Sequence, residues 1–173
     1  MRALGFAALL GVAMLPGALY ATSANDVRVS HAWLRILPGD LPAGGYATLQ
    51  NTGTQPAALT GAHSTTYADV MLHLSSVAGG TSRMRMAEAM SIPAQGTAKL
   101  APGGYHLMLT RPVHPVIPGD HVLLTLTFAD GSTLNTTFIA RPANAADAGP
   151  DRPTQPATAH ALPTTHGAVH DHD

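Results

Sequence analysis

The stretch that decides the fold is His121-Val-Leu-Leu-Thr-Leu-Thr-Phe128, followed by Ala129-Asp130-Gly131 and then by Ser132-Thr-Leu-Asn-Thr-Thr-Phe-Ile139. In the first run an apolar residue recurs at every second position, which is the period of a strand with one buried face. Asp130-Gly131 is a strong signal for a tight turn. The stretch therefore predicts an antiparallel β-hairpin.

The central part of the chain continues this character on the N-terminal side of the hairpin. Short apolar runs are separated by Gly and Pro turn signals at a spacing of roughly 8–12 residues. The other expected strands are Val27–Ile36, Tyr46–Gln50, Ala68–Leu74, Met84–Met90, Thr97–Leu100 and Tyr105–Thr110. No run shows a helical period over more than two turns. Residues 25–141 are thus expected to form one all-β domain, a sandwich or a small barrel.

Residues 1–24 have the pattern of a cleaved secretory signal. Arg2 supplies a positive charge, Ala3 to Leu15 are apolar, and small residues follow around Ala21 and Ala24. The apolar run is shorter than the ~20 residues that cross a bilayer, so a membrane anchor is the weaker interpretation. No membrane span is expected after cleavage, and the sequence predicts a periplasmic protein.

The composition changes from Pro142 onward, where Ala, Pro, Thr, Asp and Gly dominate. Such a segment buries too little apolar surface to offset chain entropy, so residues 142–173 are expected to form a disordered tail. The tail carries His160, His166, His170 and His172. Imidazoles in a short His-rich tract bind Cu(II) loosely, which makes the tail a candidate Cu(II) site beside the alternative of an idle, solvated segment.

The residue counts indicate a soft metal site and exclude several other functions. The chain has ten His, seven Met and no Cys, with 11% charged residues and a net charge of −1. Without clustered Lys and Arg, a nucleic-acid partner is not expected. The absence of Cys removes disulfides and also removes thiolate as a metal ligand. Imidazole and thioether remain as the neutral ligands.

Four of these residues form the pattern His73-x10-Met84-x21-His106-x-Met108. His106 and Met108 lie two apart in an expected strand, so their side chains project from the same face. His73 ends an apolar run, and Met84 opens the run after the Gly79-Gly80 turn. We expect three strand ends to converge on one rim and to place two imidazoles and two thioethers around one ion.

Such a donor set suits Cu(I), because thioether is a poor ligand for Zn(II) or Mg(II). A blue-copper electron-transfer site is not expected, since it needs a thiolate. Four protein ligands leave no open position for a substrate, and neither a nucleophile motif nor a general base is evident. The pattern therefore favours a protein that holds Cu(I) over an enzyme.

The surrounding sequence resembles the periplasmic PCu(A)C copper chaperone family from about Val27 to Ile139. The stretches that carry the resemblance, besides the four-residue pattern, are Ala32–Arg35, Gly45–Tyr46, Leu49–Gly53, Val70–His73, Leu100–Leu109, Pro118–Asp120 and Leu123–Phe128. The resemblance implies a cupredoxin-like Greek-key β-sandwich that carries Cu(I) toward the copper centres of cytochrome c oxidase. It implies the ligands His73, Met84, His106 and Met108, and an acceptor that is oxidase subunit II or a Sco-type copper protein.

Several residues near the motif have a second interpretation. Met71 stands where the family often has Glu; it either packs beneath the site, which we favour, or lies near the metal. Met86 is an additional thioether that could replace a ligand, whereas Met90 is expected in the core. Trp33 is expected to be a core anchor, and Arg35 to pair with one of the few acids. The other histidines before the tail, His31, His63, His114 and His121, are expected to be structural or surface residues.

The sequence leaves one functional alternative open. A periplasmic copper or zinc scavenger, or a storage protein without a dedicated acceptor, would need the same ligands and the same export. The two functions differ in how the metal leaves, because a carrier passes it directly to an acceptor and a scavenger retains it.

Overall fold

The expected hairpin is present. In a computed structural model that describes residues 22–39 and 41–148, β9 (His121–Phe128) and β10 (Thr133–Arg141) pair antiparallel from Thr127↔Thr133 to His121↔Ile139. The apolar residues at alternate positions of β9, among them Leu124, Leu126 and Phe128, are buried. The period-two pattern thus selected the core face correctly.

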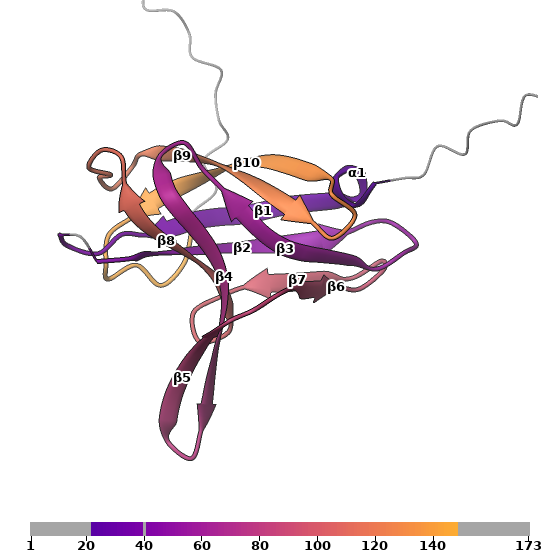
Figure 1. Cartoon of the computed structure of the whole chain (residues 1–173), viewed down its shortest axis with the longest axis horizontal. Helices are drawn as coiled ribbons and strands as arrows, with labels where there is room; N and C mark the ends of the chain where they lie inside the picture. Colours follow the sequence, from indigo (N-terminus) through magenta and orange to yellow (C-terminus); the bar gives the residue numbers. More distant parts are fainter. Residues whose placement is uncertain (1–21, 40, 149–173) are drawn as a thin grey trace, which may run out of the picture.

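The described residues form ten strands and one short helix, which confirms the expected all-β class (Figure 1). The remaining elements are α1 (Ser23–Asp26), β1 (Val27–Arg35), β2 (Ala43–Asn51), β3 (Ala57–His63), β4 (Tyr67–Ala78), β5 (Thr81–Met86), β6 (Met90–Ile92), β7 (Thr97–Leu100) and β8 (Tyr105–Pro112). Helix α1 and strand β3 were not expected. The single run expected over Met84–Met90 is wrong, because the chain leaves β5 after Met86 and re-enters the core at Met90 as β6.

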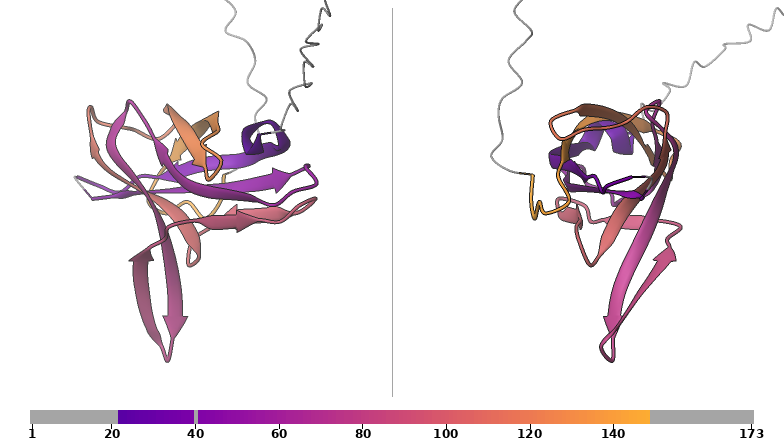
Figure 2. Two further views of the ribbon diagram at one scale, coloured as in Figure 1. Left: turned by 45° about the vertical axis from the view of Figure 1, so that its right-hand side comes forward. Right: turned by 90° about the vertical axis from the view of Figure 1, so that its left-hand side faces the viewer.

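The strands form one continuous sheet in the order β5-β4-β8-β2-β1-β10-β9-β3-β6, and β7 pairs with the second half of β2. The sheet curls over itself around one core, which is visible in the view on the right of Figure 2. The pairs are antiparallel except for β1 with β10, which run parallel. The core contains the largest fully buried side chains, namely Phe128, Phe138, Leu34, Leu49, Leu59, Met90, Ile92, Leu107, Leu109, Leu124 and Leu126.

A bulge in β1 decides which residues face outward. The register with β2 shifts between Ser30 and Trp33, and His31 in this interval has φ 51°. An extra residue in one strand reverses the alternation of the residues that follow it. Val27 and Leu34 therefore both belong to the core, and Trp33 is directed to the outer surface of the sheet.

The β4–β5 hairpin projects from the body of the fold (Figure 1). Strand β4 pairs with β8 through Leu74 and with β5 from His73 to Ala78, so the hairpin continues beyond the packed sheet. Gly79 and Gly80 form its turn with φ values of 58° and 77°, a conformation that glycine adopts without strain. All six residues of β5 are exposed.

Both described ends of the chain lie against the sheet. In α1 the backbone N–H of Ser23 donates to Asp130 at 2.7 Å, so the expected boundary between residues 24 and 25 falls inside a helix docked on the β9–β10 turn. The side chain of Arg141 donates to the carbonyl of Ala148, which holds residues 142–148 near the domain. The expected signal up to residue 21 and the tail histidines lie outside the described residues. Within the described part of the chain, no helix is long and apolar enough to cross a membrane.

Candidate metal centre

The candidate ligands lie on the outer face of three neighbouring strands, β8, β4 and β5. His73 of β4 is directly opposite His106 of β8, and Met71 is directly opposite Met108. On the other side of β4, His73 is opposite Met86, and Ser75 is opposite Met84. Because side chains alternate along a strand, all these residues share one face. We call this set, Met71, His73, Met84, Met86, His106 and Met108, the thioether–imidazole face.

The residues between them anchor this face to the protein. Leu72 and Leu107 lie on the opposite side of the same strands and are buried in the core. The expectation of three strand ends meeting at a rim is therefore wrong in its geometry. The four motif residues lie on one face of a ladder of paired strands, and His73 lies in the middle of β4.

The hydrogen-bond pattern of the ladder places Met86 closer to His73 than the sequence indicated. The N–H of Ala87 donates to the carbonyl of Leu72 at 2.8 Å, so the next pair along the ladder, His73 with Met86, is of the non-hydrogen-bonded type. Side chains of such pairs approach more closely than those of the neighbouring type. Met84 is diagonal to His73. Register thus favours Met86 as a neighbour of His73, whereas the motif spacing selects Met84.

The two histidines are held differently. Their ring centroids are 5.9 Å apart with an edge-to-face orientation of 72°. His106 is 7% exposed, and its Nδ1 lies 3.0 Å from the carbonyl oxygen of Gly104, which leaves Nε2 for another partner. A backbone carbonyl on the second ring nitrogen is the usual way in which a metal-binding imidazole is oriented.

His73 carries the most informative atom of the site. Its Nδ1 is buried and has no hydrogen-bond partner among the residues that the structure describes. Burial lowers the pKa of His73, and the neighbouring His106 lowers it further, so the ring is held in the neutral form that binds metals. A buried polar atom without a partner destabilises a protein by ~1–3 kcal/mol. A metal ion on this ring nitrogen would remove that penalty.

The carboxylate closest to the site along β4, that of Asp69, is already paired with other side chains of the protein. Asp69 is two residues before Met71 on the same face, and it forms an ion pair with Arg111 at 2.7 Å and accepts a hydrogen bond from Thr110. These hydrogen bonds, that from Arg111 foremost, lower the pKa of Asp69. Among residues 22–39 and 41–148, no three His, Cys, Asp or Glu side chains gather into a metal site. The donors left on this face are neutral, which fits a soft monovalent cation better than a hard divalent one.

The methionines differ in their exposure to solvent. Met84 is 53% and Met86 66% exposed, whereas Met71 and Met108 are only partly exposed. Met71 lies across from Met108 and is not part of the core cluster, while Met90 belongs to that cluster as expected. The face is therefore protected on the β8 side and open on the β5 side.

An aromatic cluster that the sequence did not predict borders the site. The Tyr46 ring lies 6.5 Å from that of His106 and 4.7 Å from that of Trp33. Trp33 is buried, yet it is outside the main core cluster. The structure shows no acidic partner for Arg35 among the described residues; its guanidinium instead lies over the rings of Trp33 and Tyr46, 5.4 and 5.3 Å from their centroids. The only sequence signal for this cluster was the Trp33-x-Arg35 spacing.

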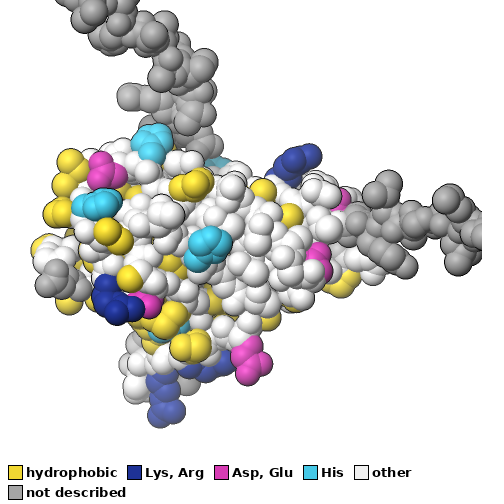
Figure 3. All heavy atoms as spheres, turned by 45° about the horizontal axis from the view of Figure 1, so that its top comes forward, with side chains coloured by type: hydrophobic (Ala, Val, Ile, Leu, Met, Phe, Trp, Pro, Cys, Tyr) yellow, Lys and Arg dark blue, Asp and Glu magenta, His cyan; other side chains and the backbone are white. Residues whose placement is uncertain are grey.

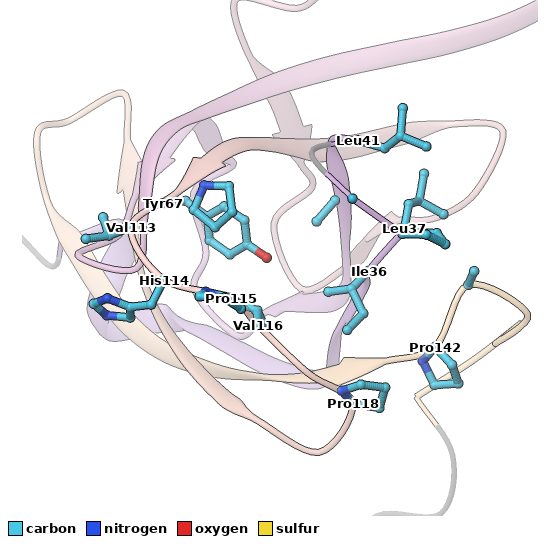
Figure 4. Close-up of a pocket in the computed structure, with 15 residues that line it drawn as sticks. Ile36, Leu37, Leu41, Tyr67, Val113, His114, Pro115, Val116, Pro118 and Pro142 are labelled. Carbon is cyan, nitrogen blue, oxygen red and sulfur yellow. The ribbon is translucent and has the colours of Figure 1, made fainter.

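A separate apolar hollow of about 660 Å³ lies near the first residue of β4 (Figure 4). It is lined by aliphatic and proline side chains, including Ile36, Leu41 and Val116. The hydroxyl of Tyr67 points into it, and the ring of His114 is turned away. Burial, with a smaller contribution from Asp120, raises the pKa of the Tyr67 phenol. The described residues that line the hollow thus offer no acid, base or nucleophile poised for chemistry.

Comparison with known proteins identifies the family of the chain. The sequence model of the lipoprotein family described as LpqE-like matches residues 27–140. The chain belongs to the LpqE-like family. A Leifsonia xyli protein named as lipoprotein Lxx21020 is 36% identical over 111 residues, which are 64% of this chain and 66% of that protein, just under two thirds of its length. Both names describe lipoproteins, a class of exported proteins.

Solved structures extend the likeness to the fold. The Cu(I) form of DR1885 from Deinococcus radiodurans is 30% identical with a TM-score of 0.55, and the match covers 72% of this chain and 83% of that one. A copper-bound PCuAC domain from PmoF2 is 22% identical with a TM-score of 0.58, covering 70% and 97%. This LpqE-like protein therefore has the cupredoxin-like β-sandwich of PCuAC domains, and the resemblance found in its sequence is confirmed.

We predict that Gly44→Ala disturbs the candidate site without replacing a candidate ligand. A Cβ at residue 44 would lie 2.5 Å from the Tyr46 hydroxyl oxygen and 2.9 Å from its Cζ, so the ring must move away from its position beside His106. We expect a loss of ~1–3 kcal/mol in unfolding free energy and a shifted His106 ring resonance in NMR spectra. Gly61→Ala is the matched control, because its Cβ would meet no atom within 4 Å. Equal behaviour of the two variants would contradict the prediction.

Proposed function

We propose that this chain is a periplasmic copper chaperone, which binds Cu(I) through His73, His106, Met84 and Met108 and delivers it for assembly of the copper centres of cytochrome c oxidase. Met71 and Met86 are auxiliary thioethers of the same site. The observation that supports the ligand set is the buried, unpartnered Nδ1 of His73 beside His106 on a face otherwise rich in methionine. The Cu(I) in DR1885, a relative of this fold, supports the choice of ion.

The arrangement of donors favours a carrier over a site that traps its ion. His106, oriented by the Gly104 carbonyl, and the partly buried Met108 form the fixed side of the site. Met84 and Met86, on the projecting strand β5, form the exposed side. A ligand from an acceptor can approach only from the exposed side, so that copper passes by exchange of thioethers while the imidazoles still hold it. No enzymatic step is part of this proposal.

The proposed function also requires export of the protein to the periplasm. The expected signal is removed before the protein functions, and the contact between Ser23 and Asp130 favours a mature chain that retains Ser23. The tail histidines His160, His166, His170 and His172 remain a predicted weak Cu(II) site, separate from the core site for Cu(I). The acceptor remains oxidase subunit II or a Sco-type copper protein.

Removal of both imidazoles tests the site. We expect His73→Ala/His106→Ala to weaken Cu(I) binding by roughly 100-fold or more, since single changes around metal ligands already cost about 10- to 100-fold. The measurement is an anaerobic competition titration against a chromophoric Cu(I) chelator, which also gives the stoichiometry. His63→Ala/His121→Ala is the matched control, because both residues are exposed and lie on other strands. Similar affinities for the two double variants would refute the ligand assignment.

The same titration ranks the two exposed methionines. We expect Met84→Leu to weaken Cu(I) binding by about tenfold and Met86→Leu to weaken it less, because Met84 remains. The double variant should lose more than the sum of the two losses in free energy, since each thioether substitutes for the other. Leu preserves the size and apolarity of these exposed side chains, so folding is unaffected. A larger loss in Met86→Leu than in Met84→Leu would exchange the roles of ligand and auxiliary.

Copper transfer separates the chaperone from a copper or zinc scavenger or storage protein. We expect the Cu(I)-loaded protein to metallate the soluble copper domain of oxidase subunit II faster than Cu(I) escapes to a chelator in bulk solution. The two rates can be compared by stopped-flow absorbance with the acceptor at increasing concentration. A transfer rate that is independent of acceptor concentration and equal to the rate of spontaneous release would favour the scavenger.

A further inference from the structure

The outer edge of β5 is an unpaired strand edge that carries candidate metal ligands. In the sheet order β5 is terminal, and among the described residues only β4 pairs with it. Edge strands with free N–H and C=O groups tend to add a further strand, and most proteins cover or interrupt them. Here the edge belongs to a hairpin that projects away from the body (Figure 1). An exposed edge in this position is accessible to a partner.

The hydrogen-bond pattern shows which backbone groups are free. Because Ala87 donates to Leu72, the odd-numbered residues Arg83 and Arg85 direct their backbone groups to β4. The backbone N–H and C=O groups of Ser82, Met84 and Met86 then point away from the sheet. Two of these three residues, Met84 and Met86, are thus the methionines whose side chains lie on the thioether–imidazole face.

The charge of the hairpin indicates the chemistry of the partner. Arg83 and Arg85 lie on the face opposite the methionines, and residues 74–86 contain no Asp or Glu. Neither arginine has an ion-pair partner within residues 22–39 and 41–148, and Glu88, two residues beyond β5, is not paired with them. Figure 3 shows Lys and Arg side chains at the projecting lower end of the molecule. An acidic strand beside β5 would place its carboxylates opposite these arginines.

We propose that the β5 edge is the docking site for the copper acceptor, which adds an acidic extended segment as a further strand beside β5. This rests on the proposed function, because it names how the acceptor of that site approaches. A strand added at this edge lies about 4.8 Å from β5. A ligand on the added strand would therefore continue the row His106, His73, Met86 by one strand spacing, at cross-strand distance from the exposed thioethers.

A second copy of this chain is a poorer occupant. Two β5 strands pairing antiparallel would place Arg83 and Arg85 of one copy against the same residues of the other, on one face. Like charges directly opposite in a ladder are destabilising. The same arrangement with an acidic segment is favourable, so the charge pattern selects a different chain.

The test uses the full mature protein without copper and a defined probe. The probe is a capped nine-residue peptide, Ser-Glu-Val-Glu-Thr-Glu-Val-Glu-Ser, which presents carboxylates on one face and uncharged Ser, Val and Thr side chains on the other. At low ionic strength we expect it to slow hydrogen exchange of the amides of Ser82, Met84 and Met86 and to leave Arg83 and Arg85 unchanged. The same peptide with Lys in place of Glu, and one with a central Pro, should have no effect.

Charge-reversed variants complete the test. Arg83→Glu/Arg85→Glu should weaken peptide binding at least tenfold, whereas the matched control Arg28→Glu/Lys99→Glu, exposed on β1 and β7, should not. Equal binding by the two variants, or no selective protection of the even-numbered amides, overturns the docking proposal. Protection of those amides that grows with protein concentration in the absence of peptide overturns it in favour of a second copy. Cu(I) affinity of Arg83→Glu/Arg85→Glu is measured in parallel and should be unchanged, so a failed docking test is distinct from a failed metal site.

Discussion

The structure of the candidate site depends on the alternation of side chains along the ladder between β4 and β8. Leu72 and Leu107 point into the core. His73 and His106 point outward because each is adjacent in the chain to one of these leucines. A shift of one residue in either strand would bury an imidazole and expose a leucine. Burial of a leucine side chain is worth about 1.5–3 kcal/mol. The hydrophobic core thus fixes the register, and the register fixes which donors meet.

The same dependence explains what the sequence could and could not predict. The boundaries of β7 and β9 were predicted because their apolar residues alternate between clear turn signals. Strand β3 was missed because Ala57–His63 contains neither a β-branched apolar nor an aromatic residue and includes Gly61. One strand was wrongly expected over Met84–Met90, because the apolar residues at its start are exposed and those at its end are buried. Met84 and Met86 are exposed on a hairpin, and hydrophobicity alone does not distinguish a metal ligand from a core residue.

The motif spacing selected four residues that the structure places on one face of neighbouring strands, but the details around them depend on contacts between distant segments. No local sequence pattern indicates that the bulge near His31 turns Trp33 outward. The same is true of Gly44, which leaves room for the Tyr46 ring beside His106. The competition between Met84 and Met86 is of the same kind. Spacing along the chain selects Met84, whereas pairing across the strands favours Met86, and only the register of the folded hairpin reveals the second.

The unpartnered Nδ1 of His73 connects stability with function. A buried polar atom without a hydrogen bond is unfavourable, and proteins tolerate such atoms mainly where another requirement is met. The ladder holds the backbone of His73 beside that of His106, and core packing of Leu72 and Leu107 on the other face keeps the two strands in register. Copper would then bind to a site that is already assembled, with little ordering on the imidazole side. In the proposed exchange, the exposed thioethers of β5 would release one ion and bind the next while the imidazole side stays in place.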